Sequence, residues 1–421
     1  MRPDEVRSAA LNAWLTEKSL AGLSEAEMVG GFCERLLQDG LPLARAVVLV
    51  DTLHPIHEGR AFRWSRGAGL ADVLEYGRTR EGANAEAWRR SPLYYMVETN
   101  QSMLRRRLTD PFPPEGMPEF ATFTELRSEG MTDCVALVTR FAATGAIGGM
   151  DAIYSFWTSD VASGFAENDI VTLQRLITPL AAALKCVSLA RIAATLVETY
   201  LGRDAGRRVL SGRIERGIAE RIGAVLWYSD LRGYTRITDT AAPDQIIPLL
   251  NDYADVVISA IHAAGGDVLK LIGDGTLAIF HNSDIGEASH AALGAALAVR
   301  QGVAELNVRR SSSKLPVTEV YLGLHVGEVF YGNIGSLDRL DFTVVGPAVN
   351  EVNRIAAMCR SVERDMLLSA ALVAAVRPAD RHRLVSVGRY ALRGIATAQE
   401  LYTLDENSVP RQHSAHPTNG Q

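Results

Sequence analysis

Apolar residues in the first half of the chain form short runs that turn residues separate. We expect strands where these runs lie, at 44–53, 59–64, 133–141 and 148–157. Beyond Trp157, apolar residues recur at alternating steps of four and three, which predicts a long helix. The residues on this spacing are Leu173, Ile177, Leu180, Leu184 and Val187. A buried domain helix and a dimer stalk explain the spacing almost equally well, and both interpretations stay open.

The second half of the chain shows a regular order of elements. We expect a strand at 223–230, a helix at about 244–263, a hairpin of two strands at 265–280, a helix at about 285–305, a strand at 320–335, and a strand entering a helix at 341–359. This β-α-β-β-α-β order is typical of a ferredoxin-like α/β (α+β) domain. The charged segment 200–222 separates the two apolar halves and is expected to link them.

Composition narrows the classes of protein that fit. The chain has 421 residues, of which 47% are hydrophobic and 22% charged, as in soluble globular proteins of two or three domains. A net charge of −6 argues against a general affinity for nucleic acid, and we expect the three arginines at 105–107 on a solvated face. The sequence predicts neither a membrane span nor a signal peptide. Four scattered cysteines fit reduced thiols in the cytoplasm and no zinc site.

Two aspartates are the first candidates for chemistry. Asp230 ends the apolar strand 223–230, and Asp274 lies in the Gly-Asp-Gly turn of the 265–280 hairpin. In a β-α-β-β arrangement the first strand lies beside this hairpin, so the two carboxylates can meet at one edge of the sheet. Each alone would be an ordinary turn residue. Together they favour a site for Mg²⁺, which prefers hard oxygen ligands.

Four segments resemble the catalytic domain of class III nucleotidyl cyclases in order and spacing. They are WYSDLRGYT (227–235), VLKLIGDGTLAIF (268–280), GLHVGEVFYGNIGS (323–336) and DFTVVGPAVNEVNRI (341–355). The resemblance implies an adenylate cyclase domain at 221–405 that converts ATP to cyclic AMP and pyrophosphate. The first half weakly resembles a GAF-like sensor. We therefore expect a sensory and dimerisation domain at 1–184, a helical signalling linker at 185–220 and a disordered tail at 406–421.

The resemblance also assigns roles to residues of the metal site. Asp230 and Asp274 would bind two ions, Mg²⁺ or Mn²⁺, and the carbonyl of Leu231 would bind one of them. Arg393 stands where a phosphate-binding lysine is frequent in the family, so it is a candidate triphosphate contact.

Further roles follow for the nucleotide. Lys270 would contact the adenine ring nitrogen and Thr343 would be its purine-selecting partner, while Asn350 would position the ribose and Arg354 would stabilise the transition state. In the family these four residues complete the metal site of the other subunit. The resemblance therefore implies a homodimer with two shared active sites.

Several alternatives stay open at this point. Lysine is a hydrogen-bond donor only, which suits adenine N1 and favours ATP over GTP, but a guanylate cyclase is the alternative enzyme. A non-catalytic module that binds nucleotide is the alternative outside the enzymes. The first half would sense an unknown small molecule or protein, or would dimerise without binding anything. Neither nucleic acid nor a membrane is expected as a partner.

Overall fold

The chain forms two compact units, Met1–Leu196 and Val197–Gln421. The computed structural model describes residues 3–141, 147, 150–395 and 397–405. The tail at 406–421, for which we expected disorder, lies outside the described residues.

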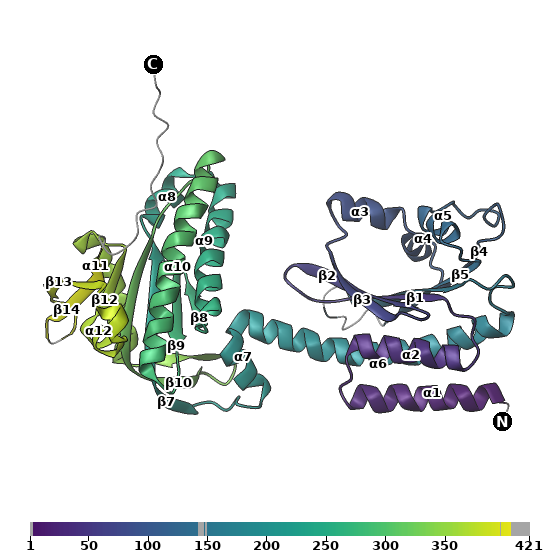
Figure 1. Ribbon diagram of the computed structural model, residues 1–421, viewed down its shortest axis with the longest axis horizontal. Helices are drawn as coiled ribbons and strands as arrows, with labels where there is room; N and C mark the ends of the chain where they lie inside the picture. The colour runs from purple at the N-terminus through teal and green to yellow at the C-terminus, as the bar shows by residue number, and fades with distance from the viewer. Residues whose placement is uncertain (1–2, 142–146, 148–149, 396, 406–421) are drawn as a thin grey trace, which may run out of the picture. The chain divides into compact units, whose positions relative to one another are not determined.

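The first unit is built on a six-stranded antiparallel sheet in the order β3-β2-β1-β6-β5-β4. Its strands are β1 (Arg45–Asp51), β2 (His57–Ser65), β3 (Gly69–Gly77), β4 (Met103–Arg107), β5 (Asp133–Arg140) and β6 (Ala152–Ser159). One face is covered by α2 and α6, with α1 packed on α2, and the other by α3, α4 and α5 (Figure 1). These helices are α1 (Pro3–Leu20), α2 (Glu25–Gln38), α3 (Gly82–Arg89), α4 (Pro92–Glu98), α5 (Ala121–Ser128) and α6 (Glu167–Leu201). The four predicted strands are present, and β3 and β4 form the edges that the sequence pattern did not reveal.

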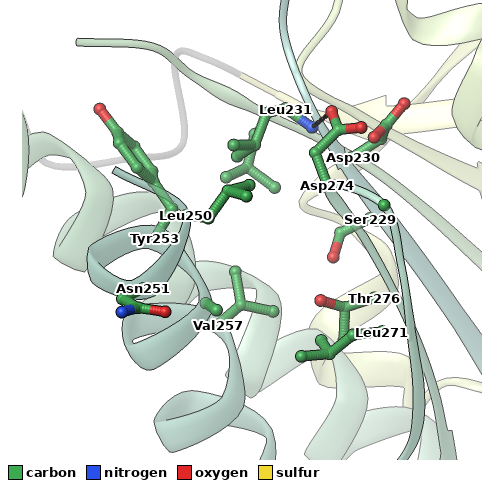
Figure 2. Close-up of a pocket in the computed structure, with 14 residues that line it drawn as sticks. Ser229, Asp230, Leu231, Leu250, Asn251, Tyr253, Val257, Leu271, Asp274 and Thr276 are labelled. Atoms are coloured by element: carbon green, nitrogen blue, oxygen red, sulfur yellow. Dashed lines mark hydrogen bonds between the residues drawn. The ribbon is translucent and has the colours of Figure 1, made fainter. Parts of the chain in front are cut away.

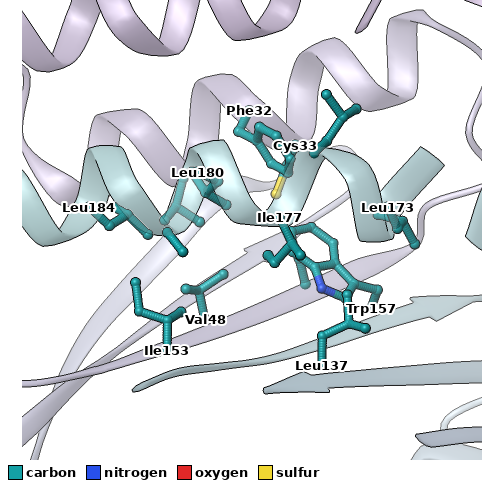
Figure 3. Packing of buried hydrophobic residues seen from close by; sticks show 14 of the residues in the cluster. Phe32, Cys33, Val48, Leu137, Ile153, Trp157, Leu173, Ile177, Leu180 and Leu184 are labelled. Carbon is teal, nitrogen blue, oxygen red and sulfur yellow. The ribbon is translucent and has the colours of Figure 1, made fainter. Parts of the chain in front are cut away.

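The spacing of four and three in α6 serves the core of the first unit. Leu173, Ile177, Leu180 and Leu184 are all buried there, against Phe32 of α2 and the sheet residues Val48, Ile153 and Trp157 (Figure 3). Burial of these side chains removes apolar surface from water and seats the helix on the sheet. Up to Leu184, the spacing of four and three is therefore explained by a buried domain helix.

The three arginines of β4 correct one expectation, because they do not form a solvated face. Arg106 is only 1% exposed, and its guanidinium donates to the carbonyls of Arg107 at 2.6 Å and Asp110 at 3.0 Å. Arg105 and Arg107, at alternate positions of the strand, donate at 2.9 Å and 3.4 Å to Asp133 of β5, whose side chain is fully buried. The backbone N–H of Phe165 also donates to Asp133, at 3.0 Å. This network joins the sheet to the segment that leads into α6.

The second unit contains the expected β-α-β-β-α-β order. Its elements are β7 (Ala219–Leu231), α8 (Tyr234–Thr240), α9 (Pro243–Ala263), β8 (Asp267–Ile272), β9 (Gly275–Phe280), α10 (Ile285–Ser312) and β10 (Val320–Gly335). The strands lie in the order β10-β7-β9-β8, which is that of a ferredoxin-like sheet. The predicted α/β fold is thus confirmed for this unit.

Further elements extend this core. They are α7 (Arg203–Leu210), β11 (Leu340–Val345), α11 (Pro347–Val362), β12 (Met366–Ser369), α12 (Ala370–Ala375), α13 (Pro378–Arg381), β13 (Leu384–Tyr390) and β14 (Gln399–Leu404). The end of β10 pairs with β11, and its beginning pairs in parallel with β12. The expected linker 200–222 holds α7 and the first residues of β7, which begins four residues before the predicted strand start at 223.

The two faces of this sheet have different coverings. Alternate residues of β7, such as Val225 and Trp227, pack with α9 and α10, while Leu226 and Tyr228 belong to the opposite face. On that opposite face α11 approaches β10 closely. A Cβ on Gly323 would lie 2.7 Å from the Val352 carbonyl oxygen, so glycine is required for this contact. The face pattern decides which side chains surround the site described below.

Length and apolar composition alone would allow α6 and α9 to cross a membrane. Both helices bury part of their apolar surface within the structure, α6 through Leu180 and Leu184 and α9 through Tyr253 and Val257. Core helices pass the same test of length and composition, so the two helices are weak evidence for a span.

The Asp133 network predicts a measurable loss of stability. We expect Asp133→Asn to lower the free energy of unfolding of the first unit by about 3 kcal/mol, because it removes the partner of two arginines in a buried site. Urea unfolding followed by tryptophan fluorescence measures this change, since Trp14, Trp64, Trp88 and Trp157 belong to the first unit.

Glu129→Gln is the control for Asp133→Asn, because it removes an exposed ion pair with Arg45 that contributes less than about 1 kcal/mol. Equal effects of the two substitutions would contradict the structural role of Asp133.

Candidate active site

Two carboxylates meet at the tips of adjacent strands. Asp230 lies near the end of β7, and Asp274 lies in the turn between β8 and β9. The pairing of Ser229 with Thr276 places these two tips side by side. The backbone N–H of Leu231 donates to Oδ2 of Asp274 at 3.3 Å, which ties the turn to β7 (Figure 2).

The carboxylates border a pocket of about 180 Å³ between the sheet and α9. Leu250, Val257 and Leu271 make much of its wall apolar, and the hydroxyl-bearing Ser229 and Thr276 also line it. Apolar walls lower the local polarity beside the two charges. The carboxylates therefore interact with each other more strongly than they would in open water.

The electrostatics of the pair reflect this crowding. The pKa of Asp230 is raised to about 7, first by burial and then by the hydrogen bond and the charge of Asp274, while the Leu231 N–H acts in the opposite direction. The pKa of Tyr228 is also raised, by burial and by the same two carboxylates. Without a cation, Asp230 therefore keeps its proton up to near neutral pH.

The donor set at this site consists of oxygen atoms. Among the described residues no group of three or more His, Cys, Asp and Glu side chains is arranged to hold a metal ion. Two carboxylates and the backbone carbonyl of Leu231 are available, and Mg²⁺ is commonly bound by one or two carboxylates with waters and substrate phosphates. The residues present thus fit a Mg²⁺-like ion whose remaining ligands would be waters and phosphate oxygens.

The two residues expected to contact the base lie on β8 and β11. Lys270 of β8 forms an ion pair with Asp341 of β11. Because side chains alternate along a strand, Asp341 and Thr343 lie on one face of β11, and Phe342 and Val344 point to the buried face. Asp341 was not predicted, although its position two residues before Thr343 was a signal for it.

The two residues expected to act on ribose and phosphate lie on α11. Asn350 is exposed in the first turn, and Arg354 follows one turn later and is half-buried. Within the described part of the chain Arg354 forms no ion pair. A Cβ on Gly394 would lie 3.3 Å from Nη2 of Arg354, so the turn that bears the exposed Arg393 lies against this guanidinium.

One chain does not bring all of these residues into one pocket. Of the eight residues with an expected role, only Asp230, Leu231 and Asp274 line the pocket at the strand tips. Lys270, Thr343, Asn350, Arg354 and Arg393 lie outside its lining. The carboxylates and the cations are therefore presented separately within a single chain.

Comparison with known proteins supports the interpretation of the second unit. Residues 219–406 match the family of the adenylate and guanylate cyclase catalytic domain. An adenylate cyclase of Anabaena cylindrica is 33% identical over 160 residues, which are 38% of this chain and 32% of that protein. Adenylate cyclase 1 of Rhizobium meliloti (strain 1021) is 26% identical over 206 residues, which are 48% of this chain and 30% of that protein. This chain thus spans about a third of the length of these relatives.

Solved structures of cyclases are similar to part of the chain. The adenylyl cyclase CyaB from P. aeruginosa is 21% identical, with a TM-score of 0.41, and the match covers 45% of this chain and 96% of that one. A bacterial light-regulated adenylyl cyclase is 18% identical with a TM-score of 0.47, over 64% of this chain and 86% of that one. Both likenesses are to cyclases, and the family match at 219–406 is to the cyclase catalytic domain of other proteins.

The raised pKa of Asp230 predicts a pH-dependent stability. The folded state holds the Asp230 proton up to about pH 7, whereas the unfolded chain releases it near pH 4, so this group makes folding less favourable as pH rises between these values. In metal-free protein we expect Asp230→Asn to raise the melting temperature at pH 8 and to leave it nearly unchanged at pH 4.

The control for Asp230→Asn is Asp239→Asn, which alters an exposed residue of α8 and is expected to shift the melting temperature equally at both pH values. A stabilisation by Asp230→Asn that does not depend on pH would contradict the raised pKa of Asp230.

Proposed function

We propose that this protein is an adenylate cyclase, a phosphorus-oxygen lyase that converts ATP to 3′,5′-cyclic AMP and pyrophosphate. The observation that carries the proposal is the pair of carboxylates, Asp230 and Asp274, held together at adjacent strand tips in a domain of the cyclase family. In this reaction the ribose 3′-oxygen attacks the α-phosphorus and loses its proton, while the bond from that phosphorus to the pyrophosphate oxygen breaks. The chemistry requires positioning and charge stabilisation.

The carboxylate pair would hold two divalent ions, Mg²⁺ or Mn²⁺, together with the carbonyl of Leu231. Bound there, such ions favour the ionised 3′-hydroxyl and offset the charge of the phosphates. Asp230 must lose its proton before it can serve as a ligand, and its raised pKa makes that step sensitive to pH near neutrality.

The other residues would act on the nucleotide. Lys270 would donate to adenine N1 and Thr343 would accept from the exocyclic amine. Asn350 would orient the ribose, and Arg354 would offset the charge that develops on the α-phosphate. Arg393, whose turn lies against Arg354, would contact the triphosphate. Among the described residues Arg354 has no carboxylate partner, which is what a role toward phosphate requires.

A homodimer with shared sites is part of the proposal. The pocket at Asp230 and Asp274 lacks every expected base, ribose and phosphate contact, so a second copy would supply them. Large apolar side chains are exposed near the carboxylates and near the expected nucleotide contacts. They are Leu271 and Ile272 of β8, Phe330 and Ile334 of β10, Leu337 of the turn between β10 and β11, and Leu340 of β11. Exposed apolar groups of this kind are common in protein interfaces.

The first unit is proposed as a regulatory domain. Its sheet with helices on both faces is a GAF-like arrangement in our interpretation, and α6 leads from its core into the second unit. Because each shared site needs residues of two chains, a change in the pairing of the catalytic domains would assemble or separate it.

Product formation tests the proposed activity directly. We expect the full chain to form cyclic AMP from ATP with Mg²⁺ or Mn²⁺, to form at most a tenth as much cyclic GMP from GTP, and to lose at least a hundredfold in rate with Asp274→Asn. Liquid chromatography of the products measures this.

Preferential formation of cyclic GMP would identify a guanylate cyclase. Nucleotide binding without product in a confirmed dimer would identify a binding module, and either result would contradict the proposal.

Mixing two inactive variants tests the shared sites. Asp230→Ala removes a metal ligand and Arg354→Ala removes the phosphate contact, so each homodimer has two defective sites. A heterodimer would contain one intact site, and we expect the mixture to regain up to about a quarter of the wild-type rate when chains pair at random.

Differently tagged chains, purified as heterodimers, control for pairing in the mixing experiment. No recovery in such heterodimers would mean that each active site lies within one chain.

A further inference from the structure

A buried histidine lies beneath the helix that bears Asn350 and Arg354. His325, in the middle of β10, is 8% exposed. Its Nε2 lies 2.8 Å from Oε2 of Glu351 on α11. The ring fits here because Gly327 has no side chain, since a Cβ at that position would lie 3.1 Å from Nε2 of His325 and 2.5 Å from Cβ of Ala348. Neither His325 nor Glu351 was assigned a role above.

The protonation of this pair follows from its surroundings. Burial lowers the pKa of His325, and the charge of Glu351 only partly opposes that effect. The buried Nδ1 has no hydrogen-bond partner among the described residues. If this nitrogen were protonated, its N–H would have no acceptor. The imidazole is therefore neutral, and its Nε2–H donates to the Glu351 carboxylate.

Two side chains, Arg354 and His325, can compete for the carboxylate of Glu351. Residues three apart on a helix are neighbours, and a carboxylate one turn before an arginine ordinarily pairs with it. Arg354 is such a neighbour of Glu351, yet within the described chain it forms no ion pair. The carboxylate of Glu351 is instead directed to His325 at 2.8 Å. His325 thus pairs with Glu351, which is the only negatively charged side chain one turn from Arg354 on α11.

We propose that His325 is a positioning residue that holds the Glu351 carboxylate away from Arg354 and so leaves this guanidinium available for the phosphates of the nucleotide. The inference rests on the proposed function and adds to it a group that never touches substrate. Loss of the histidine would release Glu351, which is only partly buried, with 24% of its side chain exposed. The nearest cation along α11 would then be Arg354.

A set of variants separates this role from a simple packing role. His325→Leu removes the donor, and we expect kcat for ATP to fall at least tenfold while KM changes less than threefold, because Arg354 acts on charge that develops in the transition state. His325→Gln places an amide N–H near the position of Nε2 and should keep kcat within threefold of wild type. In the His325→Leu background, Glu351→Gln removes the competing charge and should restore kcat to within threefold.

The matched control is His290, which also pairs with a carboxylate of the same unit, Asp380, at 2.7 Å. In that pair His290 is exposed and Asp380 is half-buried, and both belong to other elements, α10 and α13, so His290→Leu should leave kcat unchanged. Melting curves confirm that each variant is folded. If Glu351→Gln does not rescue His325→Leu, or if His325→Gln is as damaging as His325→Leu, the inference is wrong.

A structural measurement distinguishes failure of this inference from failure of the proposed function. If wild-type protein forms no cyclic nucleotide, the proposed function fails. Crystal structures of the full chain with His325→Leu then decide the inference. A Glu351 carboxylate within 4 Å of the Arg354 guanidinium, the usual limit of an ion pair, supports it. A carboxylate that stays apart from Arg354 overturns it.

Discussion

The backbone ladder of β7 is the interaction on which the second unit depends. One edge of β7 pairs with β9, which brings the turn of Asp274 beside Asp230, and the other edge pairs with β10 over thirteen residues. β10 in turn supports α11 through the close approach at Gly323. A shift of β7 by one residue would turn Asp230 to the opposite face of the sheet. The carboxylate pair and the helix of Arg354 are therefore positioned by the same set of hydrogen bonds.

Charged side chains of the second unit lie in close groups. The two aspartates share a crowded, partly apolar site that raises the pKa of Asp230. Lys270 is paired with Asp341, and Glu351 is paired with His325. In the proposed function, divalent ions would offset the charge of the two aspartates. Under the proposed function, ions, nucleotide and a second copy would therefore stabilise one another.

The first unit holds its long helix by buried charges as well as by apolar contacts. Asp133 binds the segment before α6, and farther along the helix Arg191 lies 3.1 Å from Glu25 of α2, whose side chain is nearly fully buried. Removal of one partner from such a site is unfavourable, so these pairs specify how the helix sits within its own unit. In the proposed regulatory role, a helix anchored in this way would move as a whole element.

Local pattern was enough to predict the elements that matter most for function. The apolar run at 223–230, the Gly-Asp-Gly turn and the β-α-β-β-α-β order predicted Asp230 and Asp274 as neighbours, because strand ends and strand order need no knowledge of distant contacts. The burial of Arg106 and the pair of His325 with Glu351 could not be found in this way. Their partners lie far away in the sequence or on another element, and burial of a polar residue depends on which face the fold covers. Tertiary structure decided these contacts, since the free energy of a buried charge is set by the groups that surround it in space.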